Sequence, residues 1–223
     1  MKFIGHLDML RFFQRLLRRA GFRVIYTEGM SPHMSMSFAF PLGVGMTSDS
    51  EYVDVDLEDR ITGDEIVSRL NQVTAEGVHI TGARQIGITK AEKGMAAVAR
   101  ADYTLNFREG CEWEPGWEAR FSEWLKQDTI LAVKKSKNTE KEINLRPMIY
   151  RAETDADGIH LGLSAGLNVN IRPELVMDTF ARDSGYDCRM SMFLINRDEV
   201  FGDKGENGSH QFVSLFDLGE EIL

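Results

Sequence analysis

The order in which helical and extended patterns follow one another is the feature that most constrains the fold of this chain. Apolar side chains recur at helical spacing between residues 9 and 20, and Gly21 then ends the helix. A second helix is predicted after Thr62, because Glu65 stands three residues later, at the spacing of a capping box. Extended patterns lie before, between and after the two helices, at residues 2–5, 22–26, 34–39, 51–57 and 78–86.

The second half of the chain repeats this order of elements. Helical patterns lie at 117–127 and 173–184, and extended patterns lie at 103–107, 130–135, 144–150, 159–163 and 189–196. In the split βαβ arrangement, two helices cover one face of a four-stranded antiparallel sheet and leave the other face open to a partner. We therefore predict an α+β protein of two tandem ferredoxin-like (split βαβ) subdomains with antiparallel sheets.

The chain length also fits two small domains. A length of 223 residues can bury one large core or two small ones. The polar stretch after residue 87 is a natural linker, and the last residues are rich in Gly and polar side chains before a short apolar end. The predicted division is an N-terminal ferredoxin-like domain, a linker, a C-terminal ferredoxin-like domain and a mobile tail, at residues 1–87, 88–98, 99–197 and 198–223.

Charge and cysteine content argue against several classes of protein. A net charge of −9 and a pI near 5.1 disfavour a protein that coats nucleic acid over its whole surface, although a local basic patch stays open. Cys111 and Cys188 are far apart and form no C-x-x-C pair, so we expect no bound metal and no cofactor. We also expect the protein to be located in the reducing cytoplasm. No apolar run reaches the roughly 18 residues of a membrane span, and we expect no membrane contact and no export leader.

The first predicted helix carries a stripe of arginines. Four of them, together with Asp8, fall within an arc of about 100° opposite the apolar side, namely Arg11, Arg15, Arg18 and Arg19. One interpretation is an ordinary solvated helix face, with Asp8 paired to Arg11. The other is anion recognition, because the rigid guanidinium fork matches the oxygens of phosphate and carboxylate.

The loop from Tyr26 to Ser37 is the second candidate for a ligand site. Ser31 and Ser37 offer hydroxyl groups there, and His33 follows a proline in a turn. If His6 lies close to His33, the two imidazoles would serve as acid and base on a ribose 2′-hydroxyl, because imidazole titrates near neutrality. A structural role for either histidine, and an ordinary connection between two strands, are the alternatives.

Two further segments carry charge. Asp54 and Asp56 alternate along an extended stretch, so they share one face of it and can meet the arginine stripe or the cations of a partner. In the second half, a basic hairpin is predicted from the crowding of cationic side chains at Lys134, Lys135, Lys137, Lys141 and Arg146. Lysines that keep an exposed hairpin tip in solution are the competing interpretation. The segment LGVGMTS at 42–48 lacks the Lys of a phosphate-binding loop and is predicted to be a turn.

The first quarter of the chain also resembles a known family. It carries KFIGHLD at 2–8, RRAG at 18–21, YTEGMSPH at 26–33, SFAFPL at 37–42 and EYVD at 51–54. This run resembles the N-terminal motif of the radical-SAM-linked protein family, a domain of unknown function found fused to or beside radical SAM proteins. The matching positions are Gly5, His6, Asp8, Arg11, Arg18, Arg19, Tyr26, Gly29, Pro32, His33, Ser37, Pro41, Leu42 and Glu51.

The resemblance implies a radical SAM protein as partner and a further stretch of strand before Lys2. This chain has no C-x-x-x-C-x-x-C motif of its own, so it carries no radical SAM cluster. The leading hypothesis is a cytoplasmic accessory module that binds RNA, or an RNA-linked substrate, for a separate radical SAM enzyme. The alternatives are an RNA-cleaving or RNA-modifying enzyme that uses His6 and His33, and a protein-docking adaptor without RNA contact.

Overall fold

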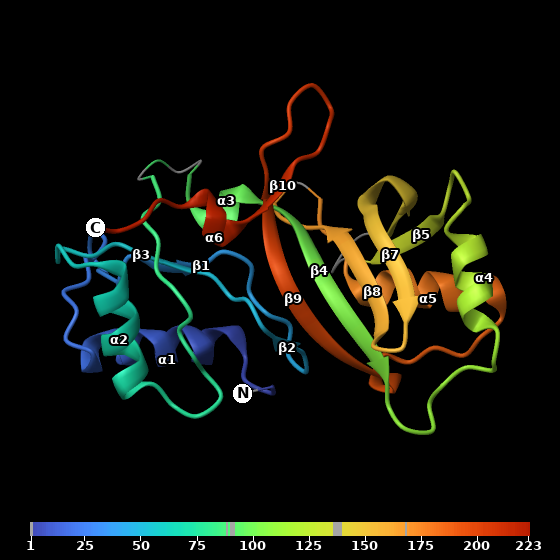
Figure 1. Cartoon of the computed structure of the whole chain (residues 1–223), viewed down its shortest axis with the longest axis horizontal. Helices are drawn as coiled ribbons and strands as arrows, with labels where there is room; N and C mark the ends of the chain where they lie inside the picture. Colours follow the sequence, from blue (N-terminus) through green and yellow to red (C-terminus); the bar gives the residue numbers. More distant parts are fainter. Residues whose placement is uncertain (1, 88, 90–91, 136–139, 168) are drawn as a thin grey trace. The chain divides into compact units, whose positions relative to one another are not determined.

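The computed structural model (Figure 1) describes residues 2–87, 89, 92–135, 140–167 and 169–223. Over these residues it contains six α-helices and ten strands in three sheets, so the predicted α+β class is confirmed. The chain divides into two compact units. Unit 1 comprises Met1–Ala99 and Val200–Leu223, and unit 2 comprises Arg100–Glu199.

The two predicted helices of unit 1 are present. α1 spans His6–Arg19, and it ends where Gly21 adopts a φ of 74°, which favours glycine. α2 spans Gly63–Val73, and the Thr62 side chain accepts a hydrogen bond from the Glu65 N–H at 3.3 Å, as the capping spacing predicts. Figure 1 shows α1 and α2 close to each other at the lower left. The short helices α3 and α6 span Gly94–Ala97 and Leu215–Leu218.

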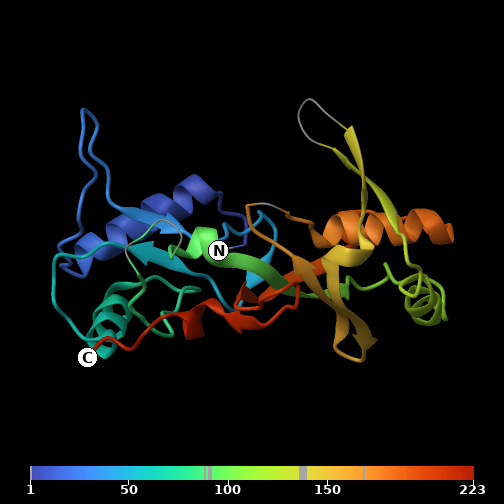
Figure 2. The same cartoon turned by 90° about the horizontal axis from the view of Figure 1, so that it is seen from above.

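A small antiparallel sheet lies over the two helices. β1 (Met36–Phe38) pairs with β3 (Val53–Val55), and the isolated bridges Val24–Leu57 and Tyr26–Met34 extend this pairing. The predicted strands at 34–39 and 51–57 are therefore confirmed over shorter stretches. Figure 2 shows the blue hairpin between α1 and β1 extending away from the strands.

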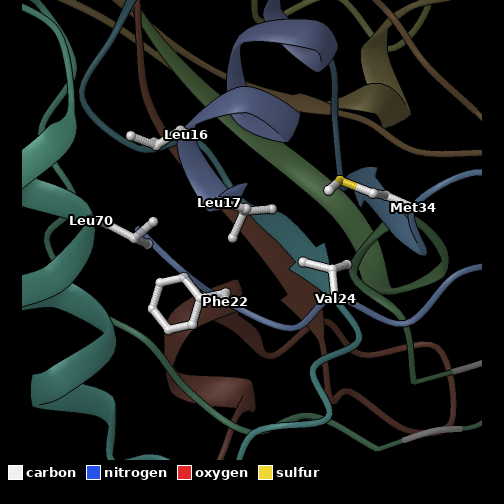
Figure 3. Packing of buried hydrophobic residues seen from close by; sticks show 6 residues of the cluster. All are labelled: Leu16, Leu17, Phe22, Val24, Met34 and Leu70. Atoms are coloured by element: carbon white, nitrogen blue, oxygen red, sulfur yellow. The ribbon is translucent and has the colours of Figure 1, made fainter. Parts of the chain in front are cut away.

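The core of unit 1 lies between the helices and one face of this sheet. Figure 3 shows six of its side chains, Leu16, Leu17, Phe22, Val24, Met34 and Leu70. Each of the six is at most 8% exposed. Met36 and Val55 point to the same face of the sheet and pack against the cluster. Ser37 and Asp54, the next pair in the register, therefore point to the other face, and both are polar.

Three of the predicted strands in unit 1 are not formed. Residues 22–26 contribute only the isolated bridges of Val24 and Tyr26. Lys2 and Phe3 lie in a turn, and residues 78–86 form no strand, although Gln85 forms an isolated bridge with Glu220. A side chain takes the place of the missing strand partner. The Asn71 amide donates to the Ile80 carbonyl at 2.8 Å and accepts from the Ile80 N–H at 2.9 Å. The backbone polar groups of Ile80 are thus satisfied without a neighbouring strand.

The largest sheet is mixed and has six strands, in the order β10-β9-β4-β8-β7, with β2 paired to β9. Its strands are β2 (Thr47–Ser48), β4 (Val98–Phe107), β7 (Ile149–Asp155), β8 (Gly158–Ser164), β9 (Phe193–Asp203) and β10 (Phe212–Ser214). β4 and β9 each run through the boundary between the units. The third sheet is a separate hairpin of β5 (Leu131–Lys135) and β6 (Glu140–Asn144).

The structure does not show two tandem ferredoxin-like subdomains with antiparallel sheets. Long-range pairing places strands from different parts of the chain in one mixed sheet, and the β5–β6 hairpin pairs only with itself among the described strands. The predicted strand at 144–150 is interrupted by a 3-10 turn at Arg146–Met148. Pro147 explains this interruption, because it has no N–H for a sheet. Residues 198–223 include the end of β9, β10 and α6.

Unit 2 is built on an aromatic core. α4 (Trp117–Trp124) and α5 (Pro173–Ser184), both predicted, contribute rings to it. Phe180 packs against Trp113, Phe121 and Trp124, with ring centroids 4.9 to 5.5 Å apart. Two indole N–H groups have partners, because Trp113 donates to the Asp187 carbonyl and Trp124 donates to the Asp183 carboxylate. These rings therefore have a structural role.

Candidate functional site

The arginine stripe of α1 lines a groove of about 410 Å³, here called the arginine groove. Its walls are formed by Phe12, Arg15, Arg18, Arg19 and Ala75. Helical spacing brings the three arginines to one side of α1, because residues three and four apart are neighbours on a helix surface. Three of the four arginines of the predicted stripe therefore line this groove.

The fourth arginine is engaged differently. Arg11 forms an ion pair with Asp8 at 3.1 Å, as the solvated-face interpretation predicted. Arg18 donates to the Tyr26 hydroxyl at 3.4 Å, which places a 46% exposed aromatic ring beside the groove. Within the described part of the chain, Arg15 and Arg19 have no carboxylate within 4.0 Å. Their guanidinium groups can therefore take an external anion.

A second hollow lies on the polar face of the β1–β3 sheet, and we call it the hydroxyl–carboxylate pocket. It encloses about 180 Å³ and is lined by Thr27, His33, Met34, Ser35, Met36, Ser37, Asp54, Asp56 and Lys93. Strand alternation explains its composition. His33, Ser35 and Ser37 alternate along the stretch that leads into β1, and Ser37 stands opposite Asp54 in the register. The prediction that Asp54 and Asp56 share a face is confirmed.

These two carboxylates meet a lysine and a backbone amide rather than the arginine stripe. Asp56 accepts a short hydrogen bond from the Ser35 hydroxyl and forms an ion pair with the Lys93 ammonium at 3.4 Å. Asp54 accepts from the Gly94 N–H at 2.8 Å. Burial raises the pKa of Asp54, while the Gly94 N–H and the Lys93 charge lower it in part. No local pattern in the sequence pointed to Lys93 or Gly94.

Replacing Asp54 with Asn tests this environment through stability. A carboxyl group whose pKa is higher in the folded state stabilises at low pH, and this contribution is lost as the pH rises. The wild type should therefore lose stability relative to Asp54→Asn as the pH rises from about 4 to 7. Asn is a suitable replacement because it keeps an oxygen that can accept from the Gly94 N–H. Urea denaturation at several pH values measures the difference. A constant difference between pH 4 and 7 would contradict the raised pKa.

The structure does not bring His6 and His33 together. His33 lines the hydroxyl–carboxylate pocket, and its Nδ1 lies 3.0 Å from the Thr27 hydroxyl and 3.4 Å from the Ser31 carbonyl. The His6 ring packs edge-on against Phe38, with centroids 5.5 Å apart. Phe38 shares the apolar face of β1 with Met36, whereas His33 is on the polar face. Among the described residues, no hydrogen bond or ring contact joins the two histidines.

Two of the predicted basic side chains of the second half bind backbone carbonyl groups. The Lys134 ammonium donates to the Asn170 carbonyl at 2.8 Å, and Arg146 donates to the Ile149 carbonyl at 3.2 Å. Lys135 is the last residue of β5, and the predicted Lys137 lies outside the described residues. Lys134 and Arg146 therefore act first on backbone oxygens, and Arg146 holds the turn before β7.

Metal ligation has no candidate in the described part of the chain. In that part, no group of three or more His, Cys, Asp or Glu side chains is placed to hold an ion. Burial raises the pKa of Cys188 to about 12, and the nearby Asp178 adds to this effect. The Cys188 thiol is thus a poor nucleophile and a poor ligand near neutral pH. Over the described residues, no helix is long and apolar enough to span a membrane.

Fold and site together define a mixed α+β protein with an arginine groove and a separate polar pocket on its N-terminal unit. A family model described as "Uncharacterized protein conserved in bacteria (DUF2344)" matches residues 1–174. The chain belongs to this family. No curated protein and no solved structure matches it.

Proposed function

We propose that this chain is a non-catalytic module that binds RNA, or an RNA-linked substrate, in the arginine groove and serves a separate radical SAM enzyme. The observation that carries the RNA part is the set of three arginines lining one groove, two of which have no carboxylate partner in the described part of the chain. The radical SAM partner rests on the resemblance of residues 2–57 alone.

The chemistry of the groove suits a phosphate backbone. Guanidinium groups bind phosphate oxygens in a bidentate manner, and arginine is more weakly hydrated than lysine, so less hydration is lost on binding. Arg18 and Arg19 also lie in the last turn of α1, where cations complement the helix dipole. That structural role requires no groove, and it gives no role to Arg15, which lies earlier in the helix.

An exposed aromatic ring beside the groove favours a single strand over a duplex. Tyr26 lies next to Arg18, and Phe12 contributes apolar surface to the groove. Proteins that bind single-stranded RNA combine a cationic groove with aromatic rings on which bases stack. In a duplex the bases are already stacked on each other, so Tyr26 would contribute little.

The proposal is tested by titrating a fluorescent single-stranded RNA and a duplex of the same sequence over a range of salt concentrations. We expect the single strand to bind more tightly, and we expect its affinity to fall as salt rises. Tyr26→Leu should weaken single-strand binding about tenfold without changing the salt slope, because stacking contributes about 1–3 kcal/mol per base. Tyr150→Leu, in unit 2, is the matched control. Absence of binding by the wild type at low salt would overturn the proposal.

A further inference from the structure

The hydroxyl–carboxylate pocket has hydrogen-bonding atoms that the protein itself does not use. Within the described residues, the Ser37 hydroxyl, the second carboxylate oxygen of Asp54 and the Nε2 atom of His33 have no hydrogen-bond partner. All three side chains line the same pocket. They supply one strong acceptor and two groups that can donate or accept.

The charges around the pocket select a neutral ligand. The Lys93 ammonium is part of the lining and would repel a cation. Asp54 and Asp56 are also part of the lining and would repel an anion. Asp56 is already satisfied by Ser35 and Lys93, so its charge is largely compensated inside the protein. The Asp54 carboxylate remains, and because one of its oxygens already accepts from the Gly94 N–H, the other can accept a hydrogen bond from a neutral donor.

We propose that this pocket binds the vicinal hydroxyl groups of a sugar. A hydroxyl group both donates and accepts, so one sugar hydroxyl can donate to Asp54 while its neighbour bonds to Ser37 or His33. A carboxylate that accepts from a sugar hydroxyl is a recurrent feature of ribose recognition. The volume of about 180 Å³ has room for a sugar ring but is below the range usual for a complete drug-sized ligand.

The close approach of α3 gives this pocket one fixed wall. A Cβ atom on Gly94 would lie 2.9 Å from the Ala39 Cβ and 3.0 Å from an Asp54 oxygen. The Gly94 N–H can therefore reach Asp54 only because the residue has no side chain. This contact orients Asp54 and leaves its other oxygen for a ligand. The sugar site does not depend on the proposed RNA function, because it uses none of the arginine-groove residues.

The test uses adenosine, 2′,3′-dideoxyadenosine and putrescine as probes, with binding measured by ligand-observed NMR and calorimetry on the full chain. We expect adenosine to bind and the dideoxy compound to bind at least tenfold more weakly. Asp54→Asn and Ser37→Ala should each weaken adenosine binding about tenfold or more. The first variant loses a hydrogen bond to a charged group, and the second loses the serine hydroxyl. Asp128→Asn, in unit 2, removes the same charge and should have no effect.

Three results would overturn the proposal. The first is that the dideoxy compound binds as tightly as adenosine. The second is that putrescine binds in preference to both nucleosides, and the third is that both variants bind adenosine as tightly as the wild type does. Circular dichroism verifies that each variant is folded, and Ser37→Ala decides the question if Asp54→Asn fails to fold. Adenosine binding by a protein whose arginine groove has been neutralised would separate this site from the RNA proposal.

Discussion

Replacing Arg15, Arg18 and Arg19 together with Gln is expected to weaken the binding of single-stranded RNA about a hundredfold. Each charged contact to a phosphate should contribute about 1 kcal/mol, because the side chains are exposed to water. The slope of log affinity against log salt should become shallower by about 2, since each neutralised phosphate of a single strand contributes about 0.7. Gln keeps the helix propensity and most of the side-chain length.

The choice of arginines follows from the structure. Arg11 belongs to the stripe in the sequence, but its ion pair with Asp8 makes it a less suitable target. A control variant that replaces Arg60, Arg120 and Lys204 with Gln removes the same number of charges from residues that do not line the groove. Fluorescence anisotropy at several salt concentrations gives both affinity and slope. Equal losses in the two triple variants would mean that net charge, and not the groove, holds the RNA.

The parts of the site that lie within one helix could be predicted from the sequence. The arginine stripe follows from a helical period of 3.6 residues, and the Thr62 cap follows from a spacing of three. Such features depend only on residues that are close together in the sequence. The shared face of Asp54 and Asp56 has the same origin, because alternation along a strand fixes it locally.

The parts that depend on long-range contacts could not be predicted. Lys93 and Gly94 reach Asp56 and Asp54 across about 40 positions of the chain, and nothing in their own neighbourhood marks them. The missing strand at 78–86 has a similar cause, because Asn71 supplies the hydrogen bonds that a strand would have supplied. Side-chain partners of this kind leave no periodic pattern.

Strand alternation also separates the two candidate sites of unit 1. Phe22, Val24 and Tyr26 point toward the side of the sheet that carries α1, where Tyr26 reaches Arg18. Thr27 lies one residue further and lines the hydroxyl–carboxylate pocket instead. A single hairpin therefore contributes to both sites through adjacent residues, and each site can be changed by substitutions that leave the other intact.

Replacing Leu16 with Ala is expected to lower the free energy of unfolding of unit 1 by about 3–4 kcal/mol. Leu16 is 0% exposed and belongs to the cluster between α1, α2 and the β1–β3 sheet. The loss combines the transfer free energy of the removed methyl and methylene groups with the cost of the cavity they leave. Leu7→Ala on the same helix is the control, because Leu7 is 65% exposed and a surface change there should cost about 0.5 kcal/mol or less.

Two optical probes show which unit the substitution affects. All three tryptophans, at 113, 117 and 124, belong to unit 2, so their fluorescence follows that unit during urea denaturation. Far-ultraviolet circular dichroism follows both units, because α1 and α2 lie in unit 1 and α4 and α5 lie in unit 2. If the units unfold separately, Leu16→Ala shifts part of the dichroism transition and leaves the fluorescence midpoint in place. If β4 and β9 couple them, both midpoints fall together, whereas an unchanged dichroism curve would contradict the core position of Leu16.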